Sequence, residues 1–210
     1  MKVVALVPIG SLEGAKSRLG MALDPEERRD LVLRLMARTI DATLATDSIA
    51  ATIVVSPDPA ALLEAEQLGA SVVRQIGSGL NEGVREARDV ALAGGASAVL
   101  VIPGDLPLIT PDELDRVVRA GTDAMAPDGA KLVVVLVTDR HGRGTNALFV
   151  SPPVTIDPCF GGDSAAAHRA QAMAAGARLV DLESPLSLDL DTTDDLLLVE
   201  ELAPQALRAT

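Results

Sequence analysis

The sequence contains no tryptophan and no tyrosine, and Phe149 and Phe160 supply its only aromatic rings. Its core must therefore consist of valine, leucine, isoleucine and alanine, a composition typical of a parallel sheet covered by helices. Positive charge is also scarce, because 18 basic residues face 30 acidic ones and the net charge is −12. Nucleic acids and anionic membranes bind basic surfaces, so we expect neither as a partner. A nucleotide substrate stays open, because a metal ion can reverse the local charge.

Cysteine is scarce, and long apolar runs are missing. Cys159 is the only cysteine, so no internal disulfide can form, and this indicates a reducing compartment. We interpret Cys159 as a small apolar filler, since no partner motif for a nucleophile accompanies it. No run is long enough to span a membrane, and Met1 and Lys2 lead directly into an expected strand. We expect a cytoplasmic protein with a single domain over residues 1–210.

Apolar runs and helical stripes alternate along most of the chain. Helices are expected from capping signals such as Asp24-Pro25, over residues 24–44, 58–68, 80–93, 110–121 and 165–175, and after 191. Strands are expected over residues 3–7, 52–56, 71–75, 98–102, 123–128, 131–138, 147–150 and 177–182. This alternation predicts an α/β fold.

Asp105 follows the apolar run at 98–102 and is bracketed by Pro103, Gly104 and Pro107. These residues make an abrupt exit from the strand. Ligands of open α/β sheets bind just beyond the carboxyl ends of strands, so a carboxylate here is well placed to hold a metal ion. The alternative is an Asp that only caps a turn.

The loop at residues 11–20 follows the first expected strand and Gly10, and it combines two glycines and two serines with Lys16 and Arg18. Backbone N–H groups and two cations suit phosphate binding, although the loop matches neither common phosphate-binding glycine motif. A solvated, flexible loop is the alternative. Further along, Asn81 could cap the helix that follows it or read a base edge with its amide.

Two later segments complete the candidate site. The polar stretch at 139–146 carries Arg140 and Arg143, which suit an anionic ligand, and the glycines before Ser164 precede a helix N-terminus that could bind the same anion. The alternatives are a solvated hairpin tip and, for His168, a packing role. Asp189 and Asp191 share a face of an extended segment, so a cation should offset their repulsion; Asp191 could also be a simple helix cap.

Together these motifs resemble the 2-phospho-L-lactate guanylyltransferase family, with its phosphoenolpyruvate and 3-phosphoglycerate relatives, which makes the activated precursor of coenzyme F-420. The resemblance runs to about residue 201 and rests on Lys16-Ser17-Arg18-Leu19, Gly79-Leu80-Asn81, Gly104-Asp105-Leu106-Pro107, Asp139-Arg140-x-Gly-x-Gly-Thr145-Asn146, Phe160-Gly161-x-x-Ser164-x-x-x-His168 and Asp189-x-Asp191-Thr192. It implies a three-layer α/β/α fold of the nucleotide-diphospho-sugar transferase type, with a mostly parallel mixed sheet.

The resemblance also implies roles for individual residues. Asp105, Asp189 and Asp191 would bind Mg²⁺, and Lys16 and Arg18 would hold the GTP phosphates. Asp105, Lys16 and Arg18 would be the catalytic residues. The remaining nucleotide contacts would come from Leu80, Asn81 and Pro103. The small phosphorylated acid would lie at Thr145, Gly161 and Ser164, and Arg140 and Arg143, which suit an anion by their charge, are expected to join them.

One departure from the family is Gly10, where the family often has lysine. A homodimer is compatible with the sequence. Two other activities stay open at this stage: nucleotidyl transfer to a sugar phosphate or a molybdopterin-type acceptor on the same fold, and non-catalytic nucleotide binding.

Overall fold

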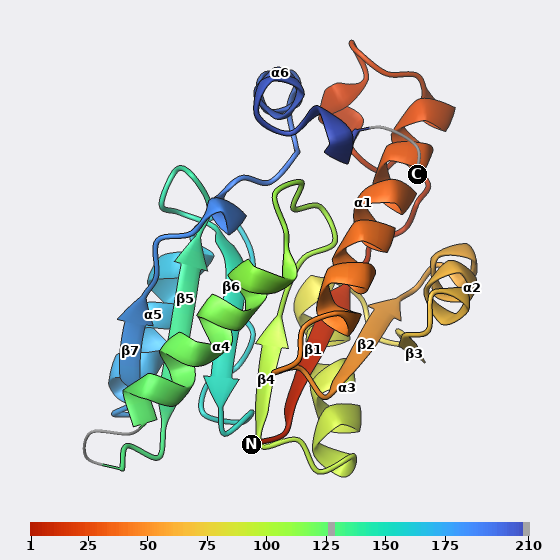
Figure 1. Ribbon diagram of the computed structural model, residues 1–210. Coiled ribbons are helices and arrows are strands. Elements are labelled where there is room, and N and C mark those ends of the chain that lie inside the picture. The colour runs from red at the N-terminus through yellow and green to blue at the C-terminus, as the bar shows by residue number, and fades with distance from the viewer. Residues whose placement is uncertain (126–128, 208–210) are drawn as a thin grey trace.

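The structure is a computed structural model that describes residues 1–125 and 129–207. Within these residues seven strands form one sheet in the order β3-β2-β1-β4-β6-β5-β7 (Figure 1). The strands are β1 (Val3–Pro8), β2 (Ala51–Ser56), β3 (Ser71–Arg74), β4 (Ala98–Val101), β5 (Val133–Thr138), β6 (Thr145–Ser151) and β7 (Arg178–Asp181). All neighbours pair in parallel except β6, which is antiparallel to both β4 and β5.

Helices cover both faces of the sheet (Figure 1). The helices are α1 (Pro25–Leu44), α2 (Pro59–Gln67), α3 (Leu80–Ala93), α4 (Pro111–Met125), α5 (Ser164–Ala174) and α6 (Thr193–Leu202), with 3-10 turns η1 (Ser17–Leu19), η2 (Pro185–Ser187) and η3 (Pro204–Ala206). Core contacts place α1, α2 and α4 on one face and α3 and α5 on the other. The predicted three-layer α/β/α fold is confirmed.

The helix starts follow from local chemistry. Asp24 accepts hydrogen bonds from the backbone N–H groups of Glu26 and Glu27, and Glu27 bonds back to the Asp24 backbone, which completes a capping box before α1. Asp58 caps α2 by accepting from the Ala60 backbone N–H, with Pro59 as the first helical residue. Both starts agree with the sequence prediction.

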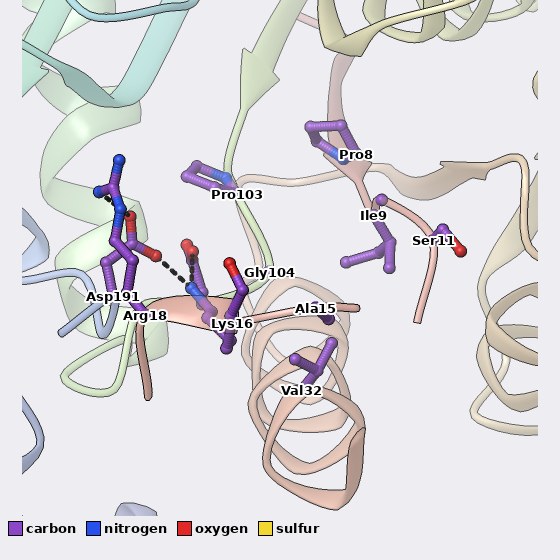
Figure 2. Close-up of a pocket in the computed structure, with 13 residues that line it drawn as sticks. Pro8, Ile9, Ser11, Ala15, Lys16, Arg18, Val32, Pro103, Gly104 and Asp191 are labelled. Atoms are coloured by element: carbon purple, nitrogen blue, oxygen red, sulfur yellow. Dashed lines mark hydrogen bonds and ion pairs between the residues drawn. The ribbon is translucent and has the colours of Figure 1, made fainter. Parts of the chain in front are cut away.

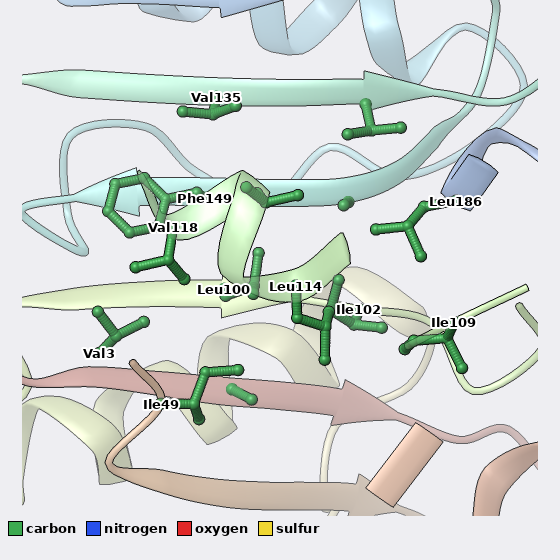
Figure 3. Close-up of a cluster of buried hydrophobic side chains, with 14 of the residues drawn as sticks. Val3, Ile49, Leu100, Ile102, Ile109, Leu114, Val118, Val135, Phe149 and Leu186 are labelled. Atoms are coloured by element: carbon green, nitrogen blue, oxygen red, sulfur yellow. The ribbon is translucent and has the colours of Figure 1, made fainter. Parts of the chain in front are cut away.

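Alternate strand residues supply the two apolar layers, as a pleated sheet requires. In β1, Val3 and Ala5 pack toward α4, whereas Val4 and Leu6 pack toward α3. The cluster beneath α4 surrounds Phe149, which is fully buried (Figure 3). Aliphatic residues thus form most of the core, as the composition predicts.

The sequence prediction for the end of α4 is wrong. We expected a stop near Gly121 and a strand over 123–128, but α4 continues to Met125, and residues 126–128 lie outside the described residues. Gly121 is buried against Phe149, and a Cβ there would lie 2.4 Å from the ring. The glycine therefore allows close packing of helix and sheet and does not end the helix.

The sheet topology brings the candidate segments together at the end of the sheet where its parallel strands finish, which is called the carboxyl edge below. Because β6 runs antiparallel to β4, its first residue, Thr145, lies at the edge where β4 ends and Asp105 follows. The β5–β6 connection and the chain after β7 reach this same edge. Among the described residues, no helix is both long enough and apolar enough to cross a lipid bilayer.

Candidate active site

Lys16 lies between two of the predicted metal-binding carboxylates. Its Nζ is 2.5 Å from Asp105 Oδ2 and 2.6 Å from Asp191 Oδ1, and its side chain is 10% exposed. Arg18 is more peripheral, with Nη1 3.9 Å from Asp191 Oδ2. Figure 2 shows both cations directed toward Asp191. The structure thus joins the first loop, the β4 exit and the segment before α6.

Two buried leucines anchor the loop that carries Lys16. Leu12 and Leu19 are both buried, and the Leu12 backbone N–H donates to Asp58 Oδ2 at 2.9 Å. Lys16 has a φ of 51°, a left-handed conformation that non-glycine residues rarely adopt. Such conformations persist where surrounding packing imposes them, often at functional sites. The loop is therefore not fully solvated, in contrast to the alternative raised by the sequence.

The exits of β1 and β4 approach each other closely beside Lys16. A Cβ on Gly104 would lie 2.2 Å from Ile9 Cδ1, so only glycine fits there without a shift of Ile9. Asp105 follows directly, and its backbone carbonyl accepts from the Leu190 N–H at 3.2 Å. This bond holds the segment of Asp189 and Asp191 beside Asp105.

Asn146 is a positioning residue that no sequence pattern assigned to the site. Its Nδ2 donates to the carbonyls of Leu186 and Ser187 at 3.0 and 3.1 Å, and it lies 3.4 Å from Asp189 Oδ1. Asn146 thereby ties β6 to the segment that carries the acidic pair. Its place in the Thr145-Asn146 motif was the only available signal.

The local charges shift two pKa values at this site. Burial alone would lower the pKa of Lys16, but Asp105 and Asp191 outweigh it and raise that pKa. Burial raises the pKa of Asp189, and repulsion from Asp105 and Asp191 adds to this effect. Lys16 therefore stays charged at neutral pH, while the surroundings of Asp189 disfavour its charged form.

The carboxylates suit a hard cation in chemistry, since Mg²⁺ binds oxygen ligands. The raised pKa of Asp189 agrees with that use, because a bound cation would favour its charged form. Among residues 1–125 and 129–207, however, no three His, Cys, Asp or Glu side chains are grouped closely enough to hold a metal ion. In this arrangement the Lys16 ammonium lies between two of the carboxylates. Magnesium binding stays a prediction.

A cavity of about 350 Å³ lies over this cluster (Figure 2). It is lined by residues from the β1 exit, the first loop, α1, the β4 exit and the α6 approach, namely Pro8, Ile9, Gly10, Ser11, Ala15, Lys16, Ser17, Arg18, Val32, Pro103, Gly104, Asp105 and Asp191. Pro103 thus joins the cavity as expected. A Cβ built on Gly10 would meet no atom within 4 Å, so a larger residue could begin there without a clash.

A second group of predicted residues meets where β6 and α5 begin. The Ala165 N–H donates to the Arg143 carbonyl at 2.9 Å and brings the two elements together, with Thr145 and Ser164 both buried beside this link. Gly161 has a φ of 150° and open space where a Cβ would project. We expected free N–H groups at this helix start, but the N–H groups of Ser164 and Ala165 already donate to backbone carbonyls.

The two predicted substrate arginines make ion pairs of their own. Arg140 Nη2 lies 2.6 Å from Asp195 Oδ1, and Asp195 is 6% exposed in α6. Arg143 pairs with the exposed Asp163 just before α5. The residues 139–144 do form the tip of the β5–β6 hairpin. The substrate-binding role of both arginines stays a prediction.

Asn81 is not the cap of α3, and its nucleotide-binding role stays a prediction. Gly79 is the cap of α3, and the Asn81 side-chain amide makes two hydrogen bonds with the Phe160 backbone. Asn81 Nδ2 donates to the Phe160 carbonyl at 3.0 Å, and the Phe160 N–H donates to Asn81 Oδ1 at 2.6 Å. Both ends of the amide are thus used to hold the 159–163 loop. Leu80 is 46% exposed at the start of α3. Neither residue lines the cavity over Lys16.

Two more sequence interpretations need correction. Thr192, with Asp195 three residues later, caps α6, so Asp191 is not the cap and its carboxylate is free to pair with Lys16. Cys159 is only partly buried, its N–H donates to His168 Nε2, and its Sγ accepts from Gln171. It is therefore a polar contact in a loop and not an apolar filler.

Comparison with known proteins decides the family. Residues 1–201 match the family described as guanylyl transferase CofC like. The chain belongs to this family. A phosphoenolpyruvate guanylyltransferase from Sphaerobacter thermophilus is 44% identical over 98% of this chain and 95% of its own, and one from Rubrobacter xylanophilus is 40% identical over 95% and 94%.

The fold agrees with this membership. A crystal structure from Desulfovibrio desulfuricans, described as a nucleotide-diphospho-sugar transferase, superposes with a TM-score of 0.75 at 17% identity, covering 97% of this chain and 90% of the other. At that identity the likeness concerns the fold alone. As a member of the guanylyl transferase family, the chain is a nucleotidyltransferase, and the resemblance seen in the motifs is confirmed.

Proposed function

We propose that this enzyme joins GTP to phosphoenolpyruvate and releases pyrophosphate, a step in the synthesis of coenzyme F-420. The observation that carries the proposal is the Lys16 ammonium between Asp105 and Asp191 in a cavity at the carboxyl edge of the sheet. Such an edge is where α/β sheets bind ligands. The names of the relatives favour phosphoenolpyruvate over 2-phospho-L-lactate and 3-phosphoglycerate.

In the proposed reaction a phosphate oxygen of the acid attacks the α-phosphorus of GTP. One P–O bond forms between that oxygen and the α-phosphorus. The bond between the α-phosphorus and the oxygen that bridges it to the β-phosphorus breaks, and pyrophosphate leaves with the electron pair of this bond. A phosphate monoester has a second pKa near ~6 and is mostly a dianion at neutral pH. The attacking oxygen therefore needs no general base, and the chain has to supply alignment and charge neutralisation.

The chain's own residues provide these two functions. Lys16 carries positive charge to the cavity and keeps it, because its pKa is raised. Arg18, whose side chain is 75% exposed, is available to the triphosphate at the mouth of the cavity. Asp105, Asp189 and Asp191 would supply oxygen ligands to Mg²⁺ if their side chains drew closer together than in the present arrangement, where Lys16 lies between two of them. The ion would supply neutralisation of phosphate charge.

The test is pyrophosphate release with Mg²⁺, in which each of four nucleoside triphosphates is combined with each of the three acids and with a sugar 1-phosphate. The proposal predicts release with GTP and phosphoenolpyruvate and little with the other pairs. Release with another base or only with the sugar phosphate would contradict it. The matched control is Asp105→Asn, which should remove the activity and keep the fold.

A further inference from the structure

His168 is the buried titratable group that the proposed mechanism does not use. It lies in α5, is fully buried, and both of its ring nitrogens have partners. Nδ1 is 3.0 Å from Thr145 Oγ1, and Nε2 is 3.0 Å from the backbone nitrogen of Cys159. The Phe160 ring packs edge-on against the imidazole, with centroids 5.0 Å apart. His168 therefore connects β6, α5 and the loop between them.

The contact with Cys159 determines where the imidazole carries its proton. A backbone N–H can only donate, so Nε2 must accept and cannot itself be protonated. A neutral ring then carries its proton on Nδ1. Burial lowers the pKa of His168 to about 4, so the ring is neutral at physiological pH.

The tautomer in turn orients the Thr145 hydroxyl. Since Nδ1–H donates, Thr145 Oγ1 accepts from the ring, and its own hydrogen points away from His168. In the opposite tautomer the hydroxyl would donate to the ring and offer only lone pairs to a ligand. A hydroxyl with a free hydrogen attracts an anion, whereas lone pairs repel one.

We propose that His168 is a positioning residue that makes Thr145 an obligatory hydrogen-bond donor to the anionic acid substrate. The proposal rests on the proposed function and on the place in the acid site that the family resemblance implies for Thr145. The same ring holds the Cys159 N–H and so steadies the loop that leads to Gly161. Asn81 supports this loop from α3 through its two bonds to Phe160. His168 would thus discriminate in favour of anions without touching the substrate.

Two amide variants separate the two bonds of the ring. In His168→Asn the amide lies near the Nδ1 position and can still donate to Thr145, but it cannot reach Cys159. In His168→Gln the amide lies near the Nε2 position and can accept from the Cys159 N–H, but it leaves Thr145 without its donor. Thermal unfolding of both variants establishes that they are folded before kinetics are compared.

The proposal predicts a selective effect on the acid. His168→Gln should raise KM for phosphoenolpyruvate by about ten-fold, which corresponds to about 1.4 kcal/mol, and change KM for GTP by less than about two-fold. His168→Asn should retain most of the affinity for the acid. In a Thr145→Val background, His168→Gln should have no additional effect on KM for the acid. Equal increases in both KM values, or an additive effect in that background, would overturn the proposal.

The tautomer can be measured without turnover. In ¹⁵N-histidine-labelled protein, two-bond correlations should show a protonated Nδ1 and an unprotonated Nε2 for His168. The exposed His141 is the only other histidine, and His141→Gln assigns the signals. A protonated Nε2 would overturn the inference. If the wild-type enzyme releases no pyrophosphate with any acid, the proposed function fails, and this spectrum still decides the tautomer.

Discussion

Asp189→Asn should make the protein more stable and less active. Asp189 is partly buried beside Asp105 and Asp191, and burial together with their charges raises its pKa above the 3.8 of an unperturbed aspartate. An asparagine keeps the shape of the side chain, and its oxygen can still face Asn146 Nδ2, now 3.4 Å from Asp189 Oδ1. The substitution therefore removes a repelled charge and little else.

The sign of the effect follows from linkage. A carboxyl whose pKa is raised by folding is protonated in both states below 3.8, so it carries no penalty there. The penalty develops as the pH rises from 3.8 to the folded pKa and is complete above it. Each pKa unit corresponds to about 1.4 kcal/mol. For a chain of this size that is a rise in Tm of roughly 3–6 °C per unit at neutral pH.

The assay combines calorimetry with pyrophosphate release. Asp189→Asn should raise Tm at neutral pH, the gain should shrink toward pH about 4, and turnover should fall by at least about 100-fold. The control is Asp47→Asn, because Asp47 is an exposed aspartate that precedes β2, at the opposite end of the strands from the site. This control should change neither Tm nor turnover. A lower Tm at neutral pH would refute the electrostatic reasoning, and near-normal turnover would refute the role of Asp189 in the site.

Three further substitutions test other parts of the structure. Lys16→Met leaves two carboxylates without their shared cation, so it should lower the free energy of unfolding in urea by about 1–3 kcal/mol and raise KM for GTP by at least about ten-fold. The control Lys16→Arg keeps the charge and should lie closer to wild type. An unchanged unfolding free energy and an unchanged KM would refute the role of Lys16 as a bridge between Asp105 and Asp191. Arg140→Met leaves the buried carboxylate of Asp195 without its partner and should lower the free energy of unfolding by about 1–3 kcal/mol. A rise in KM for the acid with no loss of stability would show instead that Arg140 binds substrate. Gly121→Ala forces a methyl group against Phe149 and should cost about 1–3 kcal/mol, whereas a stability equal to wild type would mean that α4 can shift freely.

Local signals explain why much of the site could be predicted from the sequence. Pro103 and Gly104 mark the end of β4, so Asp105 could be placed at the carboxyl edge of the sheet. The alternation of Leu188, Asp189, Leu190 and Asp191 correctly indicated leucines in the core and carboxylates on the other side. These features depend on neighbouring residues in the chain, which a sequence pattern records.

The remainder depends on contacts between distant segments. Nothing near Arg140 indicates that its partner is Asp195, and nothing near Asn81 indicates that both ends of its amide bond to Phe160. Gly121 looked like a helix stop because the close approach of a ring from β6 leaves no mark on the adjacent sequence. Tertiary packing decides such cases, and propensity only weights them.

The central claim is that the α-phosphate of GTP becomes linked to the phosphate of a three-carbon acid. The most direct measurement is ³¹P NMR of a reaction that contains the enzyme, Mg²⁺, GTP and phosphoenolpyruvate. The account predicts that both substrates disappear together and that pyrophosphate appears beside two mutually coupled phosphorus signals from a new P–O–P bond. Consumption of GTP to GMP without such coupling, or coupling only when a sugar phosphate replaces the acid, would contradict it.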